Sequence, residues 1–143
     1  MLEFGLHVAA YTRGMNQLDF SSLIAEAATF ARPIKTSEHC EAGGVAALIV
    51  SDSGKHYTGV CVDFDCSMGF CAEHAAVAEM LKNQESKIAY VVAVLWNGQV
   101  VPPCGRCREM MWQLNTENRD AMVILGAGLV KPLHELLPYP WIS

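Results

Sequence analysis

Cys71-Ala72-Glu73-His74, followed further along by Pro103-Cys104-Gly105-Arg106-Cys107, is the part of the sequence around which the rest is organised. Cys104 and Cys107 form a Cys-x-x-Cys pair, and this spacing lets two thiolates bind one tetrahedral zinc ion from a single turn. Cys71 would supply the third ligand from a distant segment. Three protein ligands leave the fourth position for water, as in catalytic rather than structural zinc sites. We therefore predict one Zn²⁺ per chain, bound by Cys71, Cys104 and Cys107.

Glu73 lies two residues after Cys71, close enough to contact that water without binding the metal. Zinc lowers the pKa of a bound water to about 7, and a neighbouring carboxylate can carry the proton to a substrate. Taken alone, Glu73 would be an ordinary carboxylate in the first turn of a helix, where the helix dipole favours it. Its spacing from Cys71 favours a catalytic role instead. Zinc deaminases of nucleobases use a site of this layout, with a Glu that is not a ligand.

The zinc motif resembles that of a known family. Cys71-Ala72-Glu73 followed by Pro103-Cys104-Gly105-Arg106-Cys107-Arg108 is similar to the signature of cytidine deaminases that act on free nucleosides. The resemblance implies a hydrolytic deaminase that converts cytidine or deoxycytidine to the uracil form, releases ammonia and serves pyrimidine salvage. It also implies that zinc-bound hydroxide attacks C4 of the ring, while Glu73 protonates N3 and later the departing ammonia.

Other segments extend the resemblance and leave the substrate open. Residues 44–62 are similar to the strand pair that precedes the signature in these deaminases. Glu135-Leu136-Leu137-Pro138 and Trp141 also resemble blasticidin S deaminase, as does the Arg at the centre of Cys104-Gly105-Arg106-Cys107. The resemblance therefore covers residues 40–141. A deaminase of a cytosine-nucleoside antibiotic such as blasticidin S stays an alternative to a cytidine deaminase.

The expected sugar-binding residues depart from the family pattern. Cys61 and Asp63 stand where the resembling enzymes carry an Asn and a Glu that hold sugar hydroxyls. A thiol is a weak donor and acceptor, and Asp is one methylene shorter than Glu. Ala42 and Gly43 replace an aromatic residue of the family. We assign Cys61 and Asp63 to substrate binding and expect the sugar end of the pocket to differ from that of a cytidine deaminase.

Two interpretations of other classes remain. A non-catalytic protein could use zinc to join two helices, but it would need His74 or a further cysteine as fourth ligand. A thiol redox protein using Cys104 and Cys107 would form a disulfide and bind no metal. We expect His74 to have a packing or interface role, because three thiolates already supply the protein's ligands and because His74 points about 100° away from Glu73 on a helix. The remaining cysteines are expected to be semi-buried thiols: Cys40, Cys61 and Cys66.

Three thiolates leave one net negative charge on the zinc centre, which makes a bound water less acidic. If the helices that begin at Cys71 and Cys104 lie side by side, the positive ends of their dipoles offset part of this charge and favour thiolates. Arg108, next to Cys107, is a second candidate for electrostatic support.

Composition predicts a compact chain with a small-molecule substrate. Hydrophobic residues make up 52% of the 143 residues and charged residues 17%, which favours a single globular domain over residues 1–143. The formal net charge is −5. Nucleic-acid-binding proteins usually present a basic face, so we expect no nucleic-acid partner.

No segment predicts export or a membrane span. The longest apolar run, Ala89 to Trp96, is far shorter than the ~18 residues of a transmembrane helix. The N-terminus carries Glu3 and lacks a basic segment followed by an apolar stretch, so we expect no secretory signal. Six cysteines without such a signal favour metal binding and free thiols over disulfides. We therefore expect a cytoplasmic protein.

Hydrophobic periodicity predicts alternating helices and strands. Helices are expected over residues 16–31, 71–82, 104–114 and 132–137. Strands are expected over residues 45–51, 56–62, 88–96 and 121–125, the first two as a hairpin preceded by a loop at 36–44. This order predicts an α/β fold, a three-layer α/β/α sandwich around a central mixed β-sheet of about five strands.

The surface of the zinc helix and the end of the chain predict self-association. Val77, Ala78 and Leu81 extend a small-residue helix surface, and Pro138-Tyr139-Pro140-Trp141 is an aromatic segment with no obvious core to enter. The resembling cytidine deaminases are homo-oligomers whose neighbouring subunits help to close the active site. We expect a homo-oligomer, a tetramer or a dimer. The alternative is a C-terminal segment that packs on its own subunit.

Overall fold

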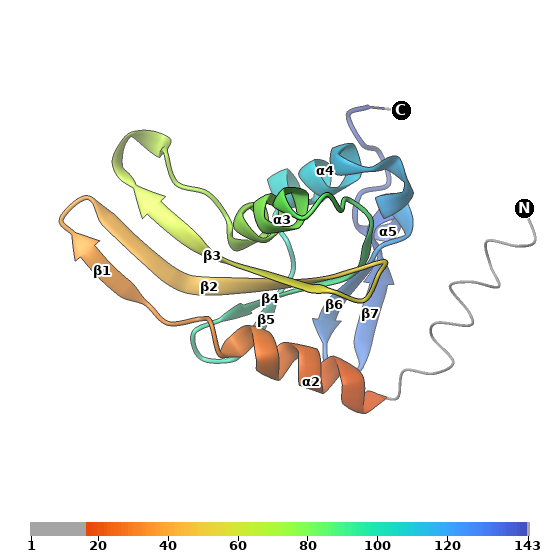
Figure 1. The fold of residues 1–143 in the computed structure, drawn as a ribbon, viewed down its shortest axis with the longest axis horizontal. Helices are drawn as coiled ribbons and strands as arrows, with labels where there is room; N and C mark the ends of the chain where they lie inside the picture. The colour runs from red at the N-terminus through yellow and green to blue at the C-terminus, as the bar shows by residue number, and fades with distance from the viewer. Residues whose placement is uncertain (1–16, 143) are drawn as a thin grey trace, which may run out of the picture.

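A computed structural model of the chain describes residues 17–142 (Figure 1). Four α-helices lie within this part of the chain: α2 (Gln17–Ala28), α3 (Ala72–Lys82), α4 (Gly105–Leu114) and α5 (Leu133–Leu136). The strands are β1 (Ile34–Ser37), β2 (Cys40–Ser51), β3 (His56–Phe64), β4 (Ile88–Leu95), β5 (Val100–Val101), β6 (Met122–Gly126) and β7 (Leu129–Pro132). Two 3₁₀ turns are η1 (Asp65–Ser67) and η2 (Thr116–Asp120). Asn16, the first residue of the first predicted helix, lies outside the described residues.

One mixed sheet contains all seven strands. Its body has the order β3-β2-β4-β6-β7, while β1 pairs with the first residues of β2 and β5 pairs with β4. Strands β4 and β6 are parallel, and the other pairs are antiparallel. The predicted hairpin of β2 and β3 and the predicted mixed sheet are confirmed.

Helices cover both faces of the sheet. Figure 1 shows α2 under one face, and α3, α4 and α5 over the other. Neighbouring residues of β2 point to opposite faces: Ala46 and Leu48 belong to the core on the α2 side, whereas Ala47 and Ile49 belong to the core on the α3 side. Because both faces are buried, β4 is apolar over nearly all its length. The predicted three-layer α/β/α sandwich is confirmed.

The small residues of α3 allow it to lie directly on β3. A Cβ atom added at Gly59 would come within 2.4 Å of the backbone nitrogen of Ala76 and 2.6 Å of the Ala72 carbonyl oxygen. Ala72 and Ala76 are fully buried in the α3-side core. This close packing fixes the N-terminal end of α3, and therefore Cys71, above the sheet.

A buried asparagine fixes the neighbouring helix. Asn118 is fully buried; its side-chain oxygen accepts a hydrogen bond from the Ile88 backbone nitrogen at 2.8 Å. Its amide nitrogen donates to the carbonyl oxygens of Met111 and Ser86, each at 3.0 Å. These bonds satisfy backbone groups that burial would otherwise leave unpaired. They join the C-terminal half of α4 to the start of β4.

The predicted loop at residues 36–44 is wrong. β1, the start of β2 and the end of β3 instead form an extended arm (residues 34–42 and 62–70), which projects from the sheet at the left of Figure 1. All four residues of β1 are exposed, so the sequence shows no alternation of polar and apolar residues there. Cross-strand hydrogen bonds, rather than burial, define these strands. β7 was also missed, because Gly126 and Gly128 predict a turn and the strand that follows is short.

No helix in the described part of the chain is long and apolar enough to cross a membrane.

Candidate metal centre

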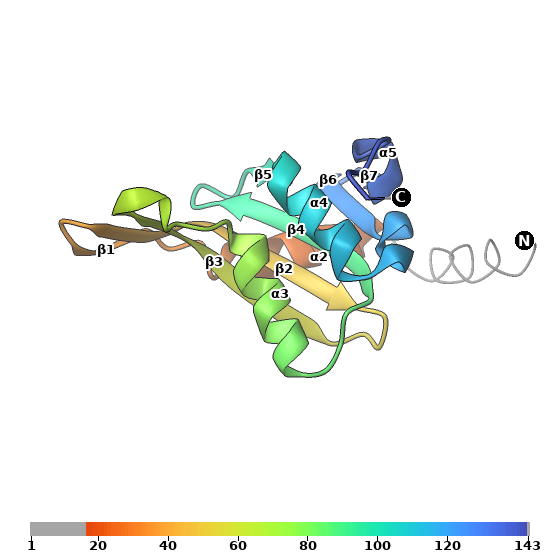
Figure 2. The same cartoon turned by 90° about the horizontal axis from the view of Figure 1, so that it is seen from above.

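The N-terminal ends of α3 and α4 meet above the same face of the sheet (Figure 2). Cys71 is the N-cap residue of α3 and Cys104 is the N-cap residue of α4, both with extended backbone conformation. Cys107 lies in the first turn of α4. The sequence placed the starts of both helices correctly to within one residue. As a result, the unpaired N–H groups and positive dipole ends of two helices surround the cysteines.

The donor atoms lie at distances that suit one zinc ion. The Sγ atoms of Cys71 and Cys104 are 3.6 Å apart, and the Cys107 Sγ is 3.6 Å from Nδ1 of His74. Two thiolates bound to one tetrahedral zinc ion at its usual bond length lie about 3.8 Å apart, and a thiolate and an imidazole nitrogen about 3.6 Å apart. The group therefore fits zinc in both chemistry and spacing.

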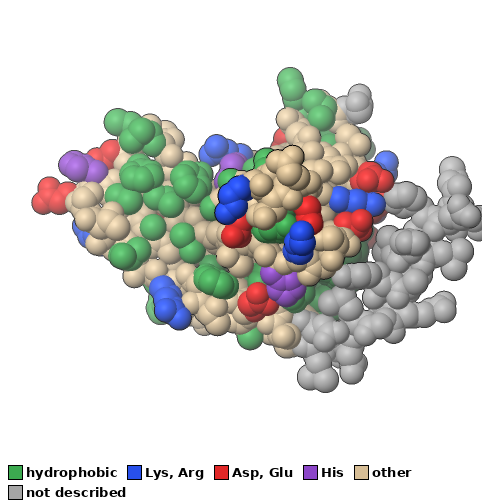
Figure 3. Space-filling model, viewed as in Figure 1, with side chains coloured by type: hydrophobic (Ala, Val, Ile, Leu, Met, Phe, Trp, Pro, Cys, Tyr) green, Lys and Arg blue, Asp and Glu red, His purple; other side chains and the backbone are tan. Residues whose placement is uncertain are grey.

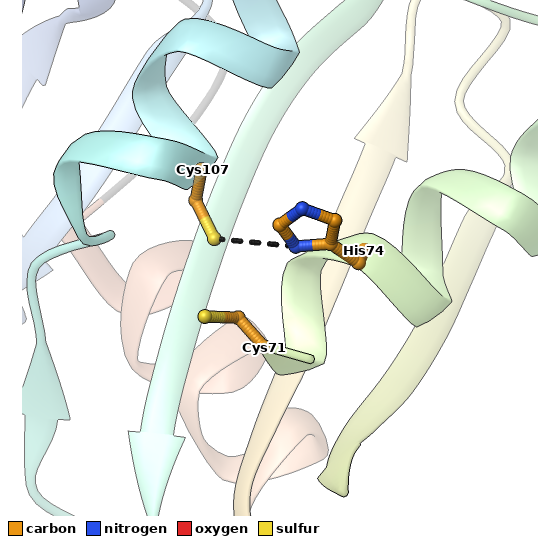
Figure 4. A group of neighbouring side chains, drawn as sticks. All are labelled: Cys71, His74 and Cys107. Atoms are coloured by element: carbon orange, nitrogen blue, oxygen red, sulfur yellow. Dashed lines mark hydrogen bonds between the residues drawn. The ribbon is translucent and has the colours of Figure 1, made fainter. Parts of the chain in front are cut away.

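His74 belongs to this donor group, in contrast to the packing or interface role expected from the sequence. Figure 4 shows its ring facing the Cys107 sulfur, with the Cys71 sulfur beside them. The donor atoms of Cys71, His74 and Cys107 all lie within 4.8 Å of one another. His74 is three residues after Cys71, and residues three apart share a helix face, so both side chains lie on the same side of α3. This spacing in the sequence is the signal that the His74 ring lies near the metal centre.

The thiols differ in their surroundings. Burial, followed by a hydrogen bond to Cys104, raises the pKa of Cys71. Burial and the negative charge of Glu73 raise the pKa of Cys107. Burial also opposes ionisation of Cys104, but the backbone amides of Cys107 and Arg106 and the adjacent thiols lower its pKa. Three thiolates in this space need a cation to ionise together, which is the charge a divalent metal supplies.

Glu73 is buried at the start of α3, with 4% of its surface exposed. Glu73 lies two residues after Cys71, and its negative charge raises the pKa of both Cys71 and Cys107. No hydrogen bond joins it to another residue of the described chain. The carboxylate is therefore available to a molecule that enters beside the cysteines.

Arg108 does not bond to the thiols. Its Nε donates to the Pro103 carbonyl oxygen at 2.8 Å, and its Nη1 donates to the Leu136 carbonyl oxygen at 3.0 Å. Arg106 is the cation whose field reaches the donor group: burial, followed by the charge of Arg106, lowers the pKa of His74.

The two expected sugar-binding residues occupy different surroundings. Cys61 is half-buried, packs against the α3-side core and accepts a hydrogen bond from the Val45 backbone nitrogen at 3.2 Å. This bond lies at the irregular part of β2, between Ala42 and Ala46. Asp63 is exposed on the arm and lines a surface pocket with Ala42 and other residues of β1 and β2.

All six cysteines are free thiols. Cys40 is half-buried and Cys66 is exposed in η1, and neither joins the donor group described above. Cys104 and Cys107 form no disulfide.

A family model for the cytidine and deoxycytidylate deaminase zinc-binding region matches residues 21–123, a span that contains Cys71, Cys104, Cys107 and Glu73. The chain belongs to this family. The resemblance noted at Cys71-Ala72-Glu73 and at the Cys-x-x-Cys pair is thereby confirmed at the level of the cytidine deaminase superfamily.

Solved cytidine deaminases have the same fold. The enzyme from Mycobacterium tuberculosis is 23% identical over 87% of this chain and 98% of its own, with a TM-score of 0.73. The enzyme from Mycobacterium leprae is 21% identical over 84% and 98%, with a TM-score of 0.69. The enzyme from Burkholderia pseudomallei is 27% identical over 85% and 98%, with a TM-score of 0.66. Family and fold together support a zinc-dependent deaminase.

Proposed function

We propose that the protein is a zinc-dependent hydrolytic deaminase that converts a cytosine-type nucleoside, cytidine or deoxycytidine, to the uracil form and ammonia. One observation carries the proposal: the Cys71 thiol, two residues before the buried Glu73, lies 3.6 Å from the Cys104 thiol and within 4.8 Å of the Cys107 thiol. Family membership adds the reaction class. In this proposal one Zn²⁺ binds per chain.

Each residue has a defined task in the proposed reaction. Cys71, Cys104 and Cys107 hold the metal and leave one position open. When bound, zinc would lower the pKa of a water at that position to about 7 and so supply a nucleophile. Glu73 accepts a proton, delivers it to N3 of the ring and later carries one to the leaving amine. Because Glu73 is buried, bulk water does not compete for these transfers.

The substrate beyond its amino-pyrimidine ring is less closely defined. Cys61 and Asp63 would contact the sugar, but the Cys61 sulfur already accepts a hydrogen bond from Val45 and Asp63 lies on the exposed arm. Cys61 and Asp63 therefore do not offer the hydrogen bonds to ribose hydroxyls that an Asn and a Glu would provide. A cytosine-nucleoside antibiotic such as blasticidin S is therefore the alternative substrate.

His74 favours one candidate of another class, a non-catalytic protein with a structural zinc. Its Nδ1, 3.6 Å from Cys107, could complete four protein ligands and leave no open position. The two functions predict opposite results for His74→Ala. A structural site would lose zinc with this change, whereas the proposed catalytic site keeps its zinc on three cysteines.

We further propose that the chain is a single domain and acts as a cytoplasmic homo-oligomer, a dimer or tetramer, in pyrimidine salvage. Free thiols and a net charge of −5 support an intracellular enzyme that binds no nucleic acid.

The structure changes the surface on which self-association would rest. Val77 is buried in its own α3-side core, so of the predicted helix surface only Ala78 and Leu81 remain exposed. Tyr139 and Trp141 of the predicted C-terminal segment are 91% and 85% exposed. Hydrophobic side chains also gather on the arm (Figure 3), where Phe64 and Met68 are 42% and 64% exposed. Apolar surface of this kind commonly marks a contact with another chain. Sedimentation at micromolar concentration tests whether the chain self-associates, and finding only monomers would refute the proposed homo-oligomer.

A substrate panel tests the proposed activity most simply. The purified protein is incubated with cytidine, deoxycytidine, cytosine and blasticidin S, and ultraviolet absorbance and ammonia release are followed. We expect release of ammonia from at least one of the cytosine nucleosides. A zinc-loaded protein that deaminates none of the four would overturn the proposal.

A further inference from the structure

The arginine that follows the last cysteine of the motif joins three parts of the chain. Arg108 lies in α4, and its guanidinium donates to Pro103, which directly precedes Cys104, and to Leu136, the last residue of α5. Its backbone nitrogen donates to the Cys104 carbonyl oxygen at 3.0 Å. One residue therefore contacts the carbonyls of both Pro103 and Cys104.

The carbonyl groups that Arg108 binds lie at the ends of two helices, just before α4 and at the last residue of α5. Pro103 is buried, and a buried carbonyl without a hydrogen bond is costly. Leu136 ends a helix, where the last carbonyls have no partner inside the helix. A guanidinium satisfies both at once because its donors point in fixed directions, and bonds from a charged donor are stronger than neutral ones.

The cysteines of the motif need this support to different degrees. Cys107 is fully buried in α4, so packing holds its side chain in place. Cys104 is exposed, so packing does not fix it, and the orientation of its thiol depends on the backbone of the segment that carries it.

We propose that Arg108 is a positioning residue for the metal centre. It holds the Pro103–Cys104 segment against the end of α5 and so keeps the Cys104 thiol beside Cys71. It acts through its two carbonyl hydrogen bonds rather than by offsetting the charge of the thiolates. The inference rests on the zinc site of the proposed function, but it concerns how the site is held and not the reaction.

The choice of substitutions separates geometry from charge. Arg108→Lys keeps the positive charge and much of the aliphatic chain but loses the planar fork that reaches two carbonyls. Arg108→Gln removes the charge as well. If geometry matters, both variants hold zinc more weakly; if only charge matters, the lysine variant behaves as the wild type.

Glu109 provides a matched control on the same helix. Its carboxylate accepts hydrogen bonds from the Trp141 backbone nitrogen at 3.1 and 3.2 Å, so it also ties the C-terminal segment to α4. It has no described bond to Pro103. Glu109→Ala therefore loosens the end of the chain without freeing the segment that carries Cys104.

The experiment measures transfer of zinc from full-length protein to a chromogenic chelator, together with the absorption of the Co²⁺-substituted protein and its thermal midpoint. We expect Arg108→Lys and Arg108→Gln to lose metal affinity by about 10- to 100-fold, as for other residues that orient ligands. The thiolate-to-cobalt band should weaken in both, while Glu109→Ala matches the wild type. If Arg108→Gln fails to fold, Arg108→Lys carries the test alone.

Two results would overturn the inference. One is wild-type zinc retention in Arg108→Lys. The other is an equal loss of zinc in Glu109→Ala, which would make the C-terminal segment as a whole responsible. Wild-type protein that binds no zinc would instead refute the proposed function, and that outcome is separate because none of these measurements uses a substrate.

Discussion

The Sγ atoms of Cys71 and Cys104 lie 3.6 Å apart although 33 positions separate the residues in the sequence. They meet because each cysteine directly precedes a helix, at its N-cap position, and both helices pack on the same face of the sheet (Figure 2). The first depends on close packing at Gly59, and the second is tied to β4 by Asn118. The geometry of the metal centre therefore depends on how α3 and α4 pack on the sheet.

Changing Glu73 to Gln tests the proposed proton transfer. The amide keeps the size and polarity of the side chain but cannot accept and return a proton. We expect zinc content to stay unchanged and kcat to fall about 100- to 10,000-fold on the substrate found in the panel. Glu135→Gln, an exposed glutamate in α5, is the control. A nearly normal kcat in Glu73→Gln would show that another group moves the proton.

The departures at Cys61 and Asp63 lead to a prediction about the sugar. Two weakened hydrogen bonds to sugar hydroxyls, at about 0.5–1.5 kcal/mol each, correspond to roughly a 5- to 150-fold loss for cytidine. Cys61→Asn combined with Asp63→Glu should raise kcat/KM for cytidine, mostly through KM. The Asn oxygen could also accept the Val45 N–H that now bonds to sulfur. Unchanged or poorer cytidine kinetics would indicate a different amine-bearing ring as substrate.

Substitution of Gly59 should disturb the packing of α3 against β3. Alanine there would place its Cβ 2.4 Å from the Ala76 nitrogen, so the helix must shift. Overpacking of this kind costs about 1–3 kcal/mol, and movement of Cys71 should also weaken zinc binding. Urea unfolding and metal content measure both effects. Gly126→Ala is the control, because nothing lies within 4 Å of its added Cβ; equal stability of the two variants would contradict the packing argument.

Glu85 should contribute stability that depends on pH. Hydrogen bonds from Ser51 and Ser53, with help from Lys55, lower the pKa of Glu85 from 4.5 to about 2. A carboxyl group with a lowered folded-state pKa stabilises the fold above its unfolded pKa, and this stabilisation is lost as the pH falls to about 2.

Glu85→Gln should therefore be less stable than the wild type near pH 6, and the difference should shrink steadily between pH 4.5 and 2. Urea unfolding across this range measures it, with Glu38→Gln in the exposed turn of the arm as control. A difference that does not change with pH would mean that the charge of Glu85 has no part in the effect.

Much of the fold was predictable because packing leaves periodic signals in the sequence. β2 and β4 are buried on both faces and appear in the sequence as apolar runs. α3 and α4 begin directly after Cys71 and Cys104, the first cysteines of the two parts of the zinc motif. The zinc motif predicted which distant segments must meet. The superfamily followed from the same residues.

The rest depends on contacts that no local pattern records. The arm is exposed, so its strands carry no alternation, and its hydrogen bonds come from pairing with distant residues. The two carbonyls bound by Arg108 are backbone groups and leave no trace in residue identity. The position of the His74 ring beside Cys107 depends on the packing of α3 against α4 and on its spacing from Cys71, which the sequence analysis did not consider.

Metal content shows whether three cysteines bind zinc and leave one position open. Freshly purified, unchelated wild-type protein is compared with Cys104→Ser and His74→Ala by elemental analysis. We expect one zinc per chain in the wild type, retention of zinc in His74→Ala, and loss of most zinc in Cys104→Ser. Zinc near zero in the wild type, or loss of zinc in His74→Ala, would contradict a three-cysteine centre with one position open.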